Sequence, residues 1–143
     1  MTTHSLGVEV GRKASMTHTV TEADVTAFAR VSGDSNPAHM DASYAGKTRF
    51  KQRLAHGMLS AGFISATLVK LPDPSVTVIY MNQSLRFRRP VFFGDTITTT
   101  VEVTALDAER RRATISTVCA NQSGEQVVTG EAEVLLDAYP FAG

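Results

Sequence analysis

The hydrophobic and polar positions of the chain change their period near residue 75. Beyond it, apolar residues alternate with polar ones, as at Val76, Val78 and Tyr80. Alternation with a period of two is typical of strands that bury one face. Further β-rich runs, separated by turn-forming residues, span 96–106, 113–120 and 126–136. We therefore expect four or five antiparallel strands, joined by short turns into a meander.

Before residue 75 the pattern indicates helices. Residues 15–20 look extended, and Thr21 then provides a helix N-cap with an acidic residue three positions later. We expect this helix to continue to about Ser32, where Gly33 ends it. Residues 57–69 are apolar or small on every side, which predicts a buried helix that is covered all round.

Together these elements predict an α+β fold, in which a curved antiparallel sheet wraps around one long central helix. Between the two helices, residues 34–55 read as a long loop with one short helix around Ala42–Ala45. Loops of this length inside compact domains are usually functional. No repeat, linker or low-complexity run divides the sequence. We therefore expect residues 1–143 to form a single domain.

Charge and cysteine content narrow the function classes. The chain has 14 Lys+Arg and 14 Asp+Glu, and this zero net charge argues against nucleic acid or an anionic membrane as a partner. A single cysteine cannot build an intrachain disulfide framework or a thiolate zinc site. The most apolar stretch, residues 58–69, is too short to cross a bilayer, and the N-terminus lacks a secretory pattern. We expect a cytoplasmic protein.

Most of the residues that could take part in a reaction lie directly after the first predicted helix. Asp34 and His39 lie five residues apart across an Asn-Pro turn, so a bend can bring the carboxylate and the imidazole together. Such a pair can share a water molecule and exchange protons near neutral pH, and Asn36 can fix its geometry. Each residue also has an ordinary structural interpretation, Asp34 in a turn, His39 in a loop and His56 as the anchor of the second helix.

Two segments resemble the hydratase motif of the MaoC-like, (R)-specific enoyl-CoA hydratases. They read FARVSGDSNPAHMD at residues 28–41 and LAHGMLSA at residues 54–61. The similarity extends to about residue 136, with minor departures such as Ala38, where the family often has leucine. It implies a hot dog fold, a homodimer and the reversible syn hydration of a trans-2-enoyl-CoA to the (R)-3-hydroxyacyl-CoA. Such products feed fatty acid metabolism and polyester (polyhydroxyalkanoate) synthesis.

The resemblance also implies roles for single residues. Asp34 matches the family's catalytic aspartate, His39 its catalytic histidine, and Gly57 the glycine whose N–H binds the thioester oxygen. Ser65 and Asn36 match further residues near the site. Adding water to an enoyl thioester builds negative charge on the thioester oxygen, which a free N–H at a helix start can stabilise. Because only protons move, we expect no cofactor.

Other residues are candidates for contact with the substrate. Leu59, Phe63 and Ile64 of the central helix would line the acyl pocket. Arg86 and Arg88 would share one face of a strand and could hold the CoA phosphates, although a solvated sheet face explains them too. The substrate-binding residues expected in full are Asn36, His56, Leu59, Phe63, Ser65, Arg86 and Arg88.

Alternative functions stay open on the sequence alone. The same catalytic pair could serve a 3-hydroxyacyl-acyl-carrier-protein dehydratase of fatty-acid synthesis. A non-catalytic acyl-CoA-binding module would keep the fold without turnover, but the intact Asp34/His39 pair argues against it. The Asn-Pro turn before His39 matches the hydratase pattern and argues against thioester hydrolysis as the function. Asp34, His39 and His56 could also ligate a metal, but no HxH, HExxH or carboxylate cluster accompanies them, so we expect none.

Overall fold

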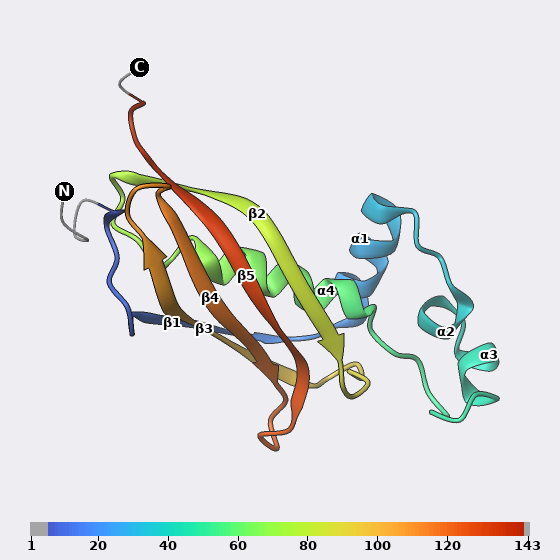
Figure 1. Cartoon of the computed structure of the whole chain (residues 1–143). Coiled ribbons are helices and arrows are strands. Elements are labelled where there is room, and N and C mark those ends of the chain that lie inside the picture. The colour runs from blue at the N-terminus through green and yellow to red at the C-terminus, as the bar shows by residue number, and fades with distance from the viewer. Residues whose placement is uncertain (1–5, 142–143) are drawn as a thin grey trace.

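A computed structural model describes residues 6–141 and shows one curved antiparallel sheet with a helix against its concave side (Figure 1). The order of the strands is β1-β3-β4-β5-β2, and every neighbouring pair is antiparallel. The expected α+β architecture is therefore confirmed. The strands are β1 (Lys13–Thr19), β2 (Val76–Phe87), β3 (Thr96–Asp107), β4 (Arg112–Ala120) and β5 (Gln126–Ala138).

The position of β2 differs from the predicted meander. Strands β3, β4 and β5 do follow one another as neighbours, but β2 pairs with β5 and forms an edge of the sheet. Alternation specifies which face of a strand is buried and does not specify its partner, so sequence pattern alone placed β2 beside β3 wrongly. β2 is one strand of 12 residues whose register shifts between Tyr80 and Asn82.

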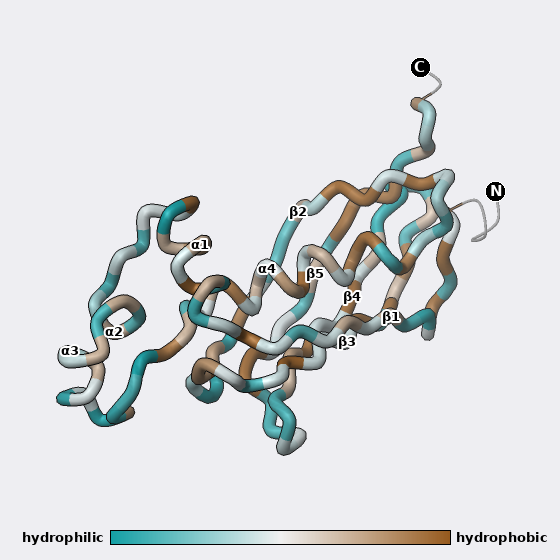
Figure 2. Tube along the Cα trace, turned by 180° about the vertical axis from the view of Figure 1, so that it is seen from behind, coloured by the Kyte–Doolittle hydropathy of each residue, from teal (hydrophilic) through white to brown (hydrophobic). Residues whose placement is uncertain are grey.

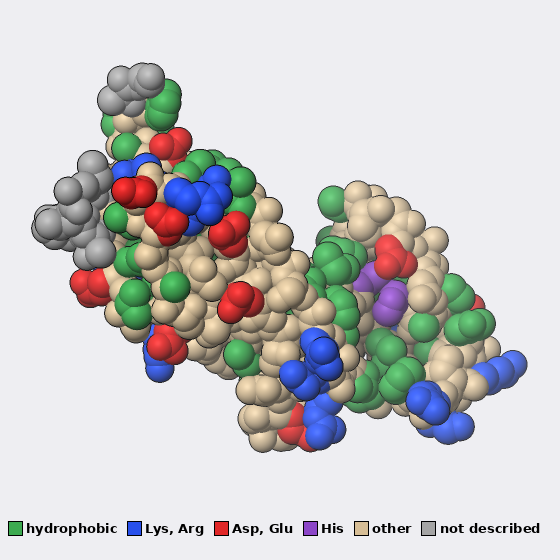
Figure 3. All heavy atoms as spheres, viewed as in Figure 1, with side chains coloured by type: hydrophobic (Ala, Val, Ile, Leu, Met, Phe, Trp, Pro, Cys, Tyr) green, Lys and Arg blue, Asp and Glu red, His purple; other side chains and the backbone are tan. Residues whose placement is uncertain are grey.

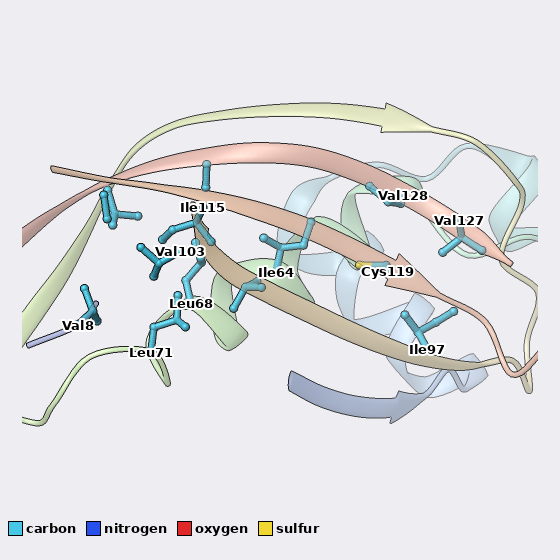
Figure 4. Packing of buried hydrophobic residues seen from close by; sticks show 14 of the residues in the cluster. Val8, Ile64, Leu68, Leu71, Ile97, Val103, Ile115, Cys119, Val127 and Val128 are labelled. Carbon is cyan, nitrogen blue, oxygen red and sulfur yellow. The ribbon is translucent and has the colours of Figure 1, made fainter. Parts of the chain in front are cut away.

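The core lies between the concave face of the sheet and helix α4 (Gly57–Leu68). Ile64 and Leu68 of α4 point toward the sheet, where Ile115 and Cys119 of β4 meet them (Figure 4). The Cys119 sulfur lies 3.4 Å from the Thr99 hydroxyl oxygen, and burial raises the pKa of its thiol. Hydrophobic positions recur along the strands as the alternation requires (Figure 2).

Helix α4 is covered on one side only, which corrects the expectation of a helix buried all round. Ile64 and Leu68 face the sheet, whereas Met58 is 53% exposed and Val69, the C-cap residue just after the helix, is 61% exposed. The sheet of this chain curves around one side of the helix and leaves the other side open. The apolar and small residues on that open side therefore require another explanation.

Helix α1 (Glu22–Ser32) has both predicted ends. The Thr21 side chain accepts a hydrogen bond from the Asp24 N–H, and the Asp24 carboxylate accepts one from the Thr21 N–H. Gly33 ends the helix in the left-handed conformation, at φ 82°. These contacts form a capping box and a glycine C-cap, so α1 is fixed by residues adjacent in sequence.

Residues 34–55 lie beyond the N-terminal end of α4 and contain two short helices, α2 (Pro37–Met40) and α3 (Ala42–Gly46). Helix α3 was expected, and α2 was not. Arg53 ties this segment to the rest of the molecule. Its Nε donates to the His39 carbonyl oxygen at 2.7 Å, its guanidinium pairs with Glu22, and it lies 4.7 Å over the Phe93 ring.

Across residues 6–141, none of the helices combines the length and the apolar character needed to span a bilayer.

Candidate active site

A cavity of about 580 Å³ opens between the 34–55 segment and the end of β2. Figure 3 shows histidine side chains in a hollow between the sheet and the helical segment. Asp34, His39 and Gly57 all line this cavity, although they come from three different parts of the chain. Its volume lies within the range of about 300–1,000 Å³ that is usual for small-molecule sites. The cavity is therefore the candidate active site.

Asp34 is held by a series of local hydrogen bonds. The Asp34 N–H donates to the Ser32 hydroxyl oxygen at 3.1 Å, and the Asn36 N–H donates to Asp34 Oδ1 at 3.2 Å. Asn36 in turn caps α2, because its side-chain oxygen accepts from the Ala38 N–H. These bonds fix one carboxylate oxygen and leave Oδ2 available to the cavity among the described residues. Asn36 thus positions the loop, as expected from its type.

His39 presents one defined nitrogen to the cavity. Its Nδ1 lies 2.9 Å from the Leu54 carbonyl oxygen, an acceptor, so Nδ1 carries the proton in this contact. In the neutral imidazole, Nε2 is then an unprotonated base. The ring is half-buried at the end of α2, where Pro37 and Asn36 set the direction of the helix. This geometry suits proton exchange with a water molecule.

His56 is buried next to Asp34 and His39. It is 2% exposed, and its Nε2 lies 2.9 Å from the Asp34 carbonyl oxygen. Its ring packs between those of His39, at 4.0 Å between centroids, and Phe28, at 4.8 Å. The His56 ring therefore contacts His39 and holds the Asp34 carbonyl oxygen at the start of α4.

The spacing of the three polar groups suits a shared water molecule. One side-chain atom each of Asp34, His39 and His56 lies within 4.8 Å of the others. Two groups that hydrogen-bond to one water lie up to about 5.6 Å apart. Ligands of a tetrahedral zinc ion, each about 2.0–2.2 Å from the metal, lie only about 3.5 Å apart.

Gly57 begins α4, and its N–H is one of the groups at a helix start that lack a helical partner. The preceding His56 provides no side-chain cap for that end of the helix. A Cβ at Gly57 would lie 2.8 Å from two carbons of the Phe87 ring, so any larger residue would force the ring or the helix start to move. The N–H and the helix dipole can thus act together on a developing negative charge in the cavity.

Five expected substrate-binding residues lie outside this cavity, within the described chain, and one of them is Asn36, the cap of α2. Leu59 and Phe63 pack against the core, and Ser65 lies exposed on α4, eight residues and about 12 Å beyond Gly57. Arg86 is exposed on β2, whereas Arg88 lines the cavity. Strand β2 ends at Phe87, so alternation no longer relates Arg88 to Arg86. Arg88 Nε donates to the Thr129 hydroxyl oxygen at 2.7 Å.

Sequence reasoning missed several lining residues that come from distant segments. Phe50 is an apolar residue within a charged run, and this contrast was the one available signal for it. Ser60 lies about one helical turn after Gly57, a spacing that could have found it. Leu54, Ala55 and Met58 flank His56 and Gly57 in the sequence, and the others reach the cavity through pairing of the strands and through loop packing. The missed residues are Phe50, Leu54, Ala55, Met58, Ser60, Phe87, Arg89, Pro90, Val91 and Val128.

Comparison with known proteins gives one consistent result. A family model for the MaoC like domain matches residues 6–127. An (R)-specific enoyl-CoA hydratase from Rhodospirillum rubrum is 49% identical over 132 residues, which are 92% of this chain and 90% of that protein.

Two solved structures agree. The unliganded R-hydratase PhaJ1 from Pseudomonas aeruginosa has a TM-score of 0.82 and 48% identity, covering 90% of this chain and 81% of that one. The (R)-hydratase from Aeromonas caviae involved in PHA biosynthesis has a TM-score of 0.83 and 42% identity, covering 90% of this chain and 96% of that one. With its hot dog fold and this match over most of its length, the chain belongs to the MaoC-like family.

Proposed function

We propose that this protein catalyses the reversible syn hydration of trans-2-enoyl-CoA to (R)-3-hydroxyacyl-CoA. The observation that carries the proposal is that an acid/base pair, Asp34 and His39, borders the same cavity as the free N–H of Gly57. Hydration of an enoyl thioester needs both features, because water must be activated while the thioester oxygen gains charge. The hydratase names of the similar proteins support this choice.

The geometry supports a simple sequence of steps. Asp34 and His39 hold one water molecule between them, and the thioester oxygen accepts a hydrogen bond from the Gly57 N–H. As the water oxygen bonds to C3, one member of the pair takes its proton and the C2–C3 double bond shifts toward the carbonyl. The enolate oxygen is stabilised by Gly57. A proton from the pair then adds to C2 on the same face, and the thioester carbonyl is restored.

The test is hydration of crotonyl-CoA, followed by the loss of the enoyl-thioester absorbance and by chiral analysis of the product. We expect an (R)-3-hydroxy product. Asp34→Asn and His39→Gln should each lower kcat by about 100- to 10,000-fold, the usual contribution of general acid/base catalysis. Asp41→Asn is the matched control, because Asp41 caps α3, does not line the cavity, and asparagine caps equally well.

Two results would contradict the proposed function. One is a wild-type protein that hydrates neither crotonyl-CoA nor longer enoyl-CoA thioesters. The other is a pair of variants, Asp34→Asn and His39→Gln, that keep the activity of the Asp41→Asn control while their thermal unfolding is unchanged.

We also propose that two copies of the chain associate. The exposed side of α4 and the edge strand β2 carry large apolar side chains, among them Met58, Val69, Ile79 and Met81. An unpaired strand edge beside an apolar helix face is a surface that a second copy can cover. Light scattering should then give a mass near twice 15.4 kDa. A mass near 15.4 kDa at micromolar concentration would exclude the dimer.

The cellular location and the metabolic role that we propose follow from the chemistry of the substrate. CoA phosphates suit Arg88, which lines the cavity. CoA thioesters are intracellular metabolites, and the one cysteine of the chain is free. We therefore place the enzyme in the cytoplasm as one MaoC-like domain that supplies (R)-3-hydroxyacyl-CoA, for example for polyester synthesis.

A further inference from the structure

Helix α2, which carries His39, is too short to hold its own direction. It has four residues, whereas isolated helices of fewer than about 12–15 residues are marginal in water. The Asn36 side chain caps its N-terminal end. The last carbonyl groups of a helix have no partner within it, and two of those in α2 belong to Ala38 and His39. The groups that bind these two carbonyls therefore decide where His39 points.

Two consecutive residues, Arg53 and Leu54, bind this end of α2. The Leu54 N–H donates to the Ala38 carbonyl oxygen at 3.2 Å, and Arg53 Nε donates to the His39 carbonyl oxygen at 2.7 Å. The Leu54 carbonyl oxygen accepts from Nδ1 of the His39 ring at 2.9 Å. His39 is thus held at its main chain and at its ring. Leu54 acts through its backbone, so of the two residues it is Arg53 whose contact depends on the type of side chain.

Arg53 is itself fixed by two further contacts. Its guanidinium pairs with Glu22 at the start of α1 and lies 4.7 Å over the ring of Phe93. The side chain is only 16% exposed, so water competes little for its donors. An arginine can make all three contacts at once, because its planar fork offers Nε and the terminal nitrogens in different directions. A lysine has one ammonium group and must give up at least one of these contacts.

The chain from Arg53 onward continues directly into the other parts of the site. His56 contacts the Asp34 carbonyl oxygen, and Gly57, the next residue, has its free N–H at the cavity. One short segment, 53–57, therefore carries the contacts to His39 at one end and the oxyanion donor at the other. Misplacing a reacting group by about 1 Å can cost about 100-fold in rate. A change in how this segment holds His39 should thus be felt in catalysis.

We propose that Arg53 is a positioning residue for the hydration, which holds His39 in place relative to the Gly57 N–H through the bond from its Nε to the His39 carbonyl oxygen. This inference rests on the proposed hydratase function. Arg53 does not line the cavity, so it contacts neither the water molecule nor the thioester. Losing its bond should therefore lower kcat, because His39 is misplaced in the transition state, and should leave KM nearly unchanged.

Two substitutions separate the contacts of Arg53. In Arg53→Gln, the side-chain amide nitrogen can take the place of Nε and still donate to the His39 carbonyl oxygen, while the pair with Glu22 is lost. In Arg53→Lys, a methylene takes that place, and the ammonium can still pair with Glu22. With crotonyl-CoA we expect Arg53→Lys to lower kcat by about 10- to 100-fold, and Arg53→Gln by less than about threefold. KM should stay within about twofold of the wild-type value in both.

Arg111 provides the matched control. Its Nε also donates to a backbone carbonyl oxygen at 2.7 Å, that of Leu136, but it lies in the turn between β3 and β4 and outside the cavity. Arg111→Lys and Arg111→Gln change the same kind of contact away from the site, so both should keep the kcat of the wild type. The Tm of every variant is measured alongside, so that a loss of activity through unfolding is recognised.

Nitrogen-15 NMR of the histidines gives a second readout, which a role in stability alone would not change. The chain has four histidines, and His39→Gln identifies the signals of His39. At alkaline pH, where imidazoles are neutral, wild-type His39 should show the tautomer protonated on Nδ1, because that nitrogen faces the Leu54 carbonyl oxygen. Arg53→Lys should show a mixture of both tautomers, and Arg53→Gln the signals of the wild type.

The proposal is overturned if Arg53→Lys keeps the kcat of the wild type, or if Arg53→Gln loses as much as Arg53→Lys. It is also overturned if kcat follows Tm across the arginine variants while the His39 tautomer is unchanged, since Arg53 then acts on stability alone. If the wild type hydrates no substrate, the proposed function fails instead. The NMR comparison then still tests the hold of Arg53 on His39, because it needs no substrate.

Discussion

His56 links the Asp34 loop to the start of α4 through one buried ring. It immediately precedes Gly57, and its Nε2 contacts the carbonyl oxygen of Asp34. Its Nδ1 is buried and has no hydrogen-bond partner among residues 6–141. A buried polar atom left in this way costs about 1–3 kcal/mol. The hydrogen bond to Asp34 and the packing on His39 and Phe28 offset part of that cost.

Gly57 gives the sharpest prediction at the scale of single residues. In Gly57→Ala, the new Cβ would lie 2.8 Å from the Phe87 ring, so the ring or the helix start must move. We expect kcat with crotonyl-CoA to fall about 100-fold, the usual cost of disturbing an oxyanion donor. Adding Phe87→Leu should recover part of the loss, because it removes the ring. Full activity of Gly57→Ala would contradict this role for the glycine.

Among the helices and strands, α1 shows how much local sequence determines. Its N-cap Thr21 and its C-cap Gly33 were both predicted, because a capping box and a glycine stop depend on residues next to them in the chain. The edge position of β2 and the open side of α4 were not predicted, because both depend on which distant segment lies alongside.

The residues of the candidate site were also predicted where they depend on local sequence and missed where they depend on distant segments. Asp34 and His39 were found because a five-residue spacing across a turn is a local feature. Phe87 and Val128 were not found, since β2 and β5 bring them to the cavity only after pairing. Ser65 was expected from the resemblance and lies outside the cavity, on the exposed side of α4.

The cap of α1 makes a prediction about pH. Burial raises the pKa of Asp24, but hydrogen bonds from His18 and Thr21 outweigh it, and the net pKa is below 3.8. An Asp whose pKa is lower in the folded state than in the unfolded state stabilises the fold when the pH is above its unfolded pKa. This contribution is lost as the pH falls through its folded pKa. The unfolding free energy of the wild type should therefore exceed that of Asp24→Asn by about 0.5 kcal/mol at pH 7.

Urea unfolding at pH 7, 4 and 3 checks this expectation. The difference in unfolding free energy between wild type and Asp24→Asn should be present at pH 4 and above and should shrink as pH falls below 3.8. A difference that is as large at pH 3 as at pH 7 would show that the charge of Asp24 is not its cause.

For the whole molecule, the decisive surface is the edge formed by β2. Met81 lies at the register shift of this strand and is 47% exposed. A charge on a strand edge opposes pairing with another edge, so Met81→Asp should shift the mass from twice 15.4 kDa toward 15.4 kDa. Thr104→Asp, on the exposed side of β3, is the control and should leave the mass unchanged. Light scattering over a concentration series measures both.

The single cysteine lies where the sheet meets the helix. The Cys119 sulfur is fully buried and contacts Ser60 of α4 and Thr99 of β3, and burial raises the pKa of its thiol. A thiol reagent can reach it only when these elements separate. The labelling rate of Cys119 therefore measures how often the core opens, and no engineered probe is needed. Cysteines added at the surface would be labelled first, leaving Cys119 silent while the fold stays closed.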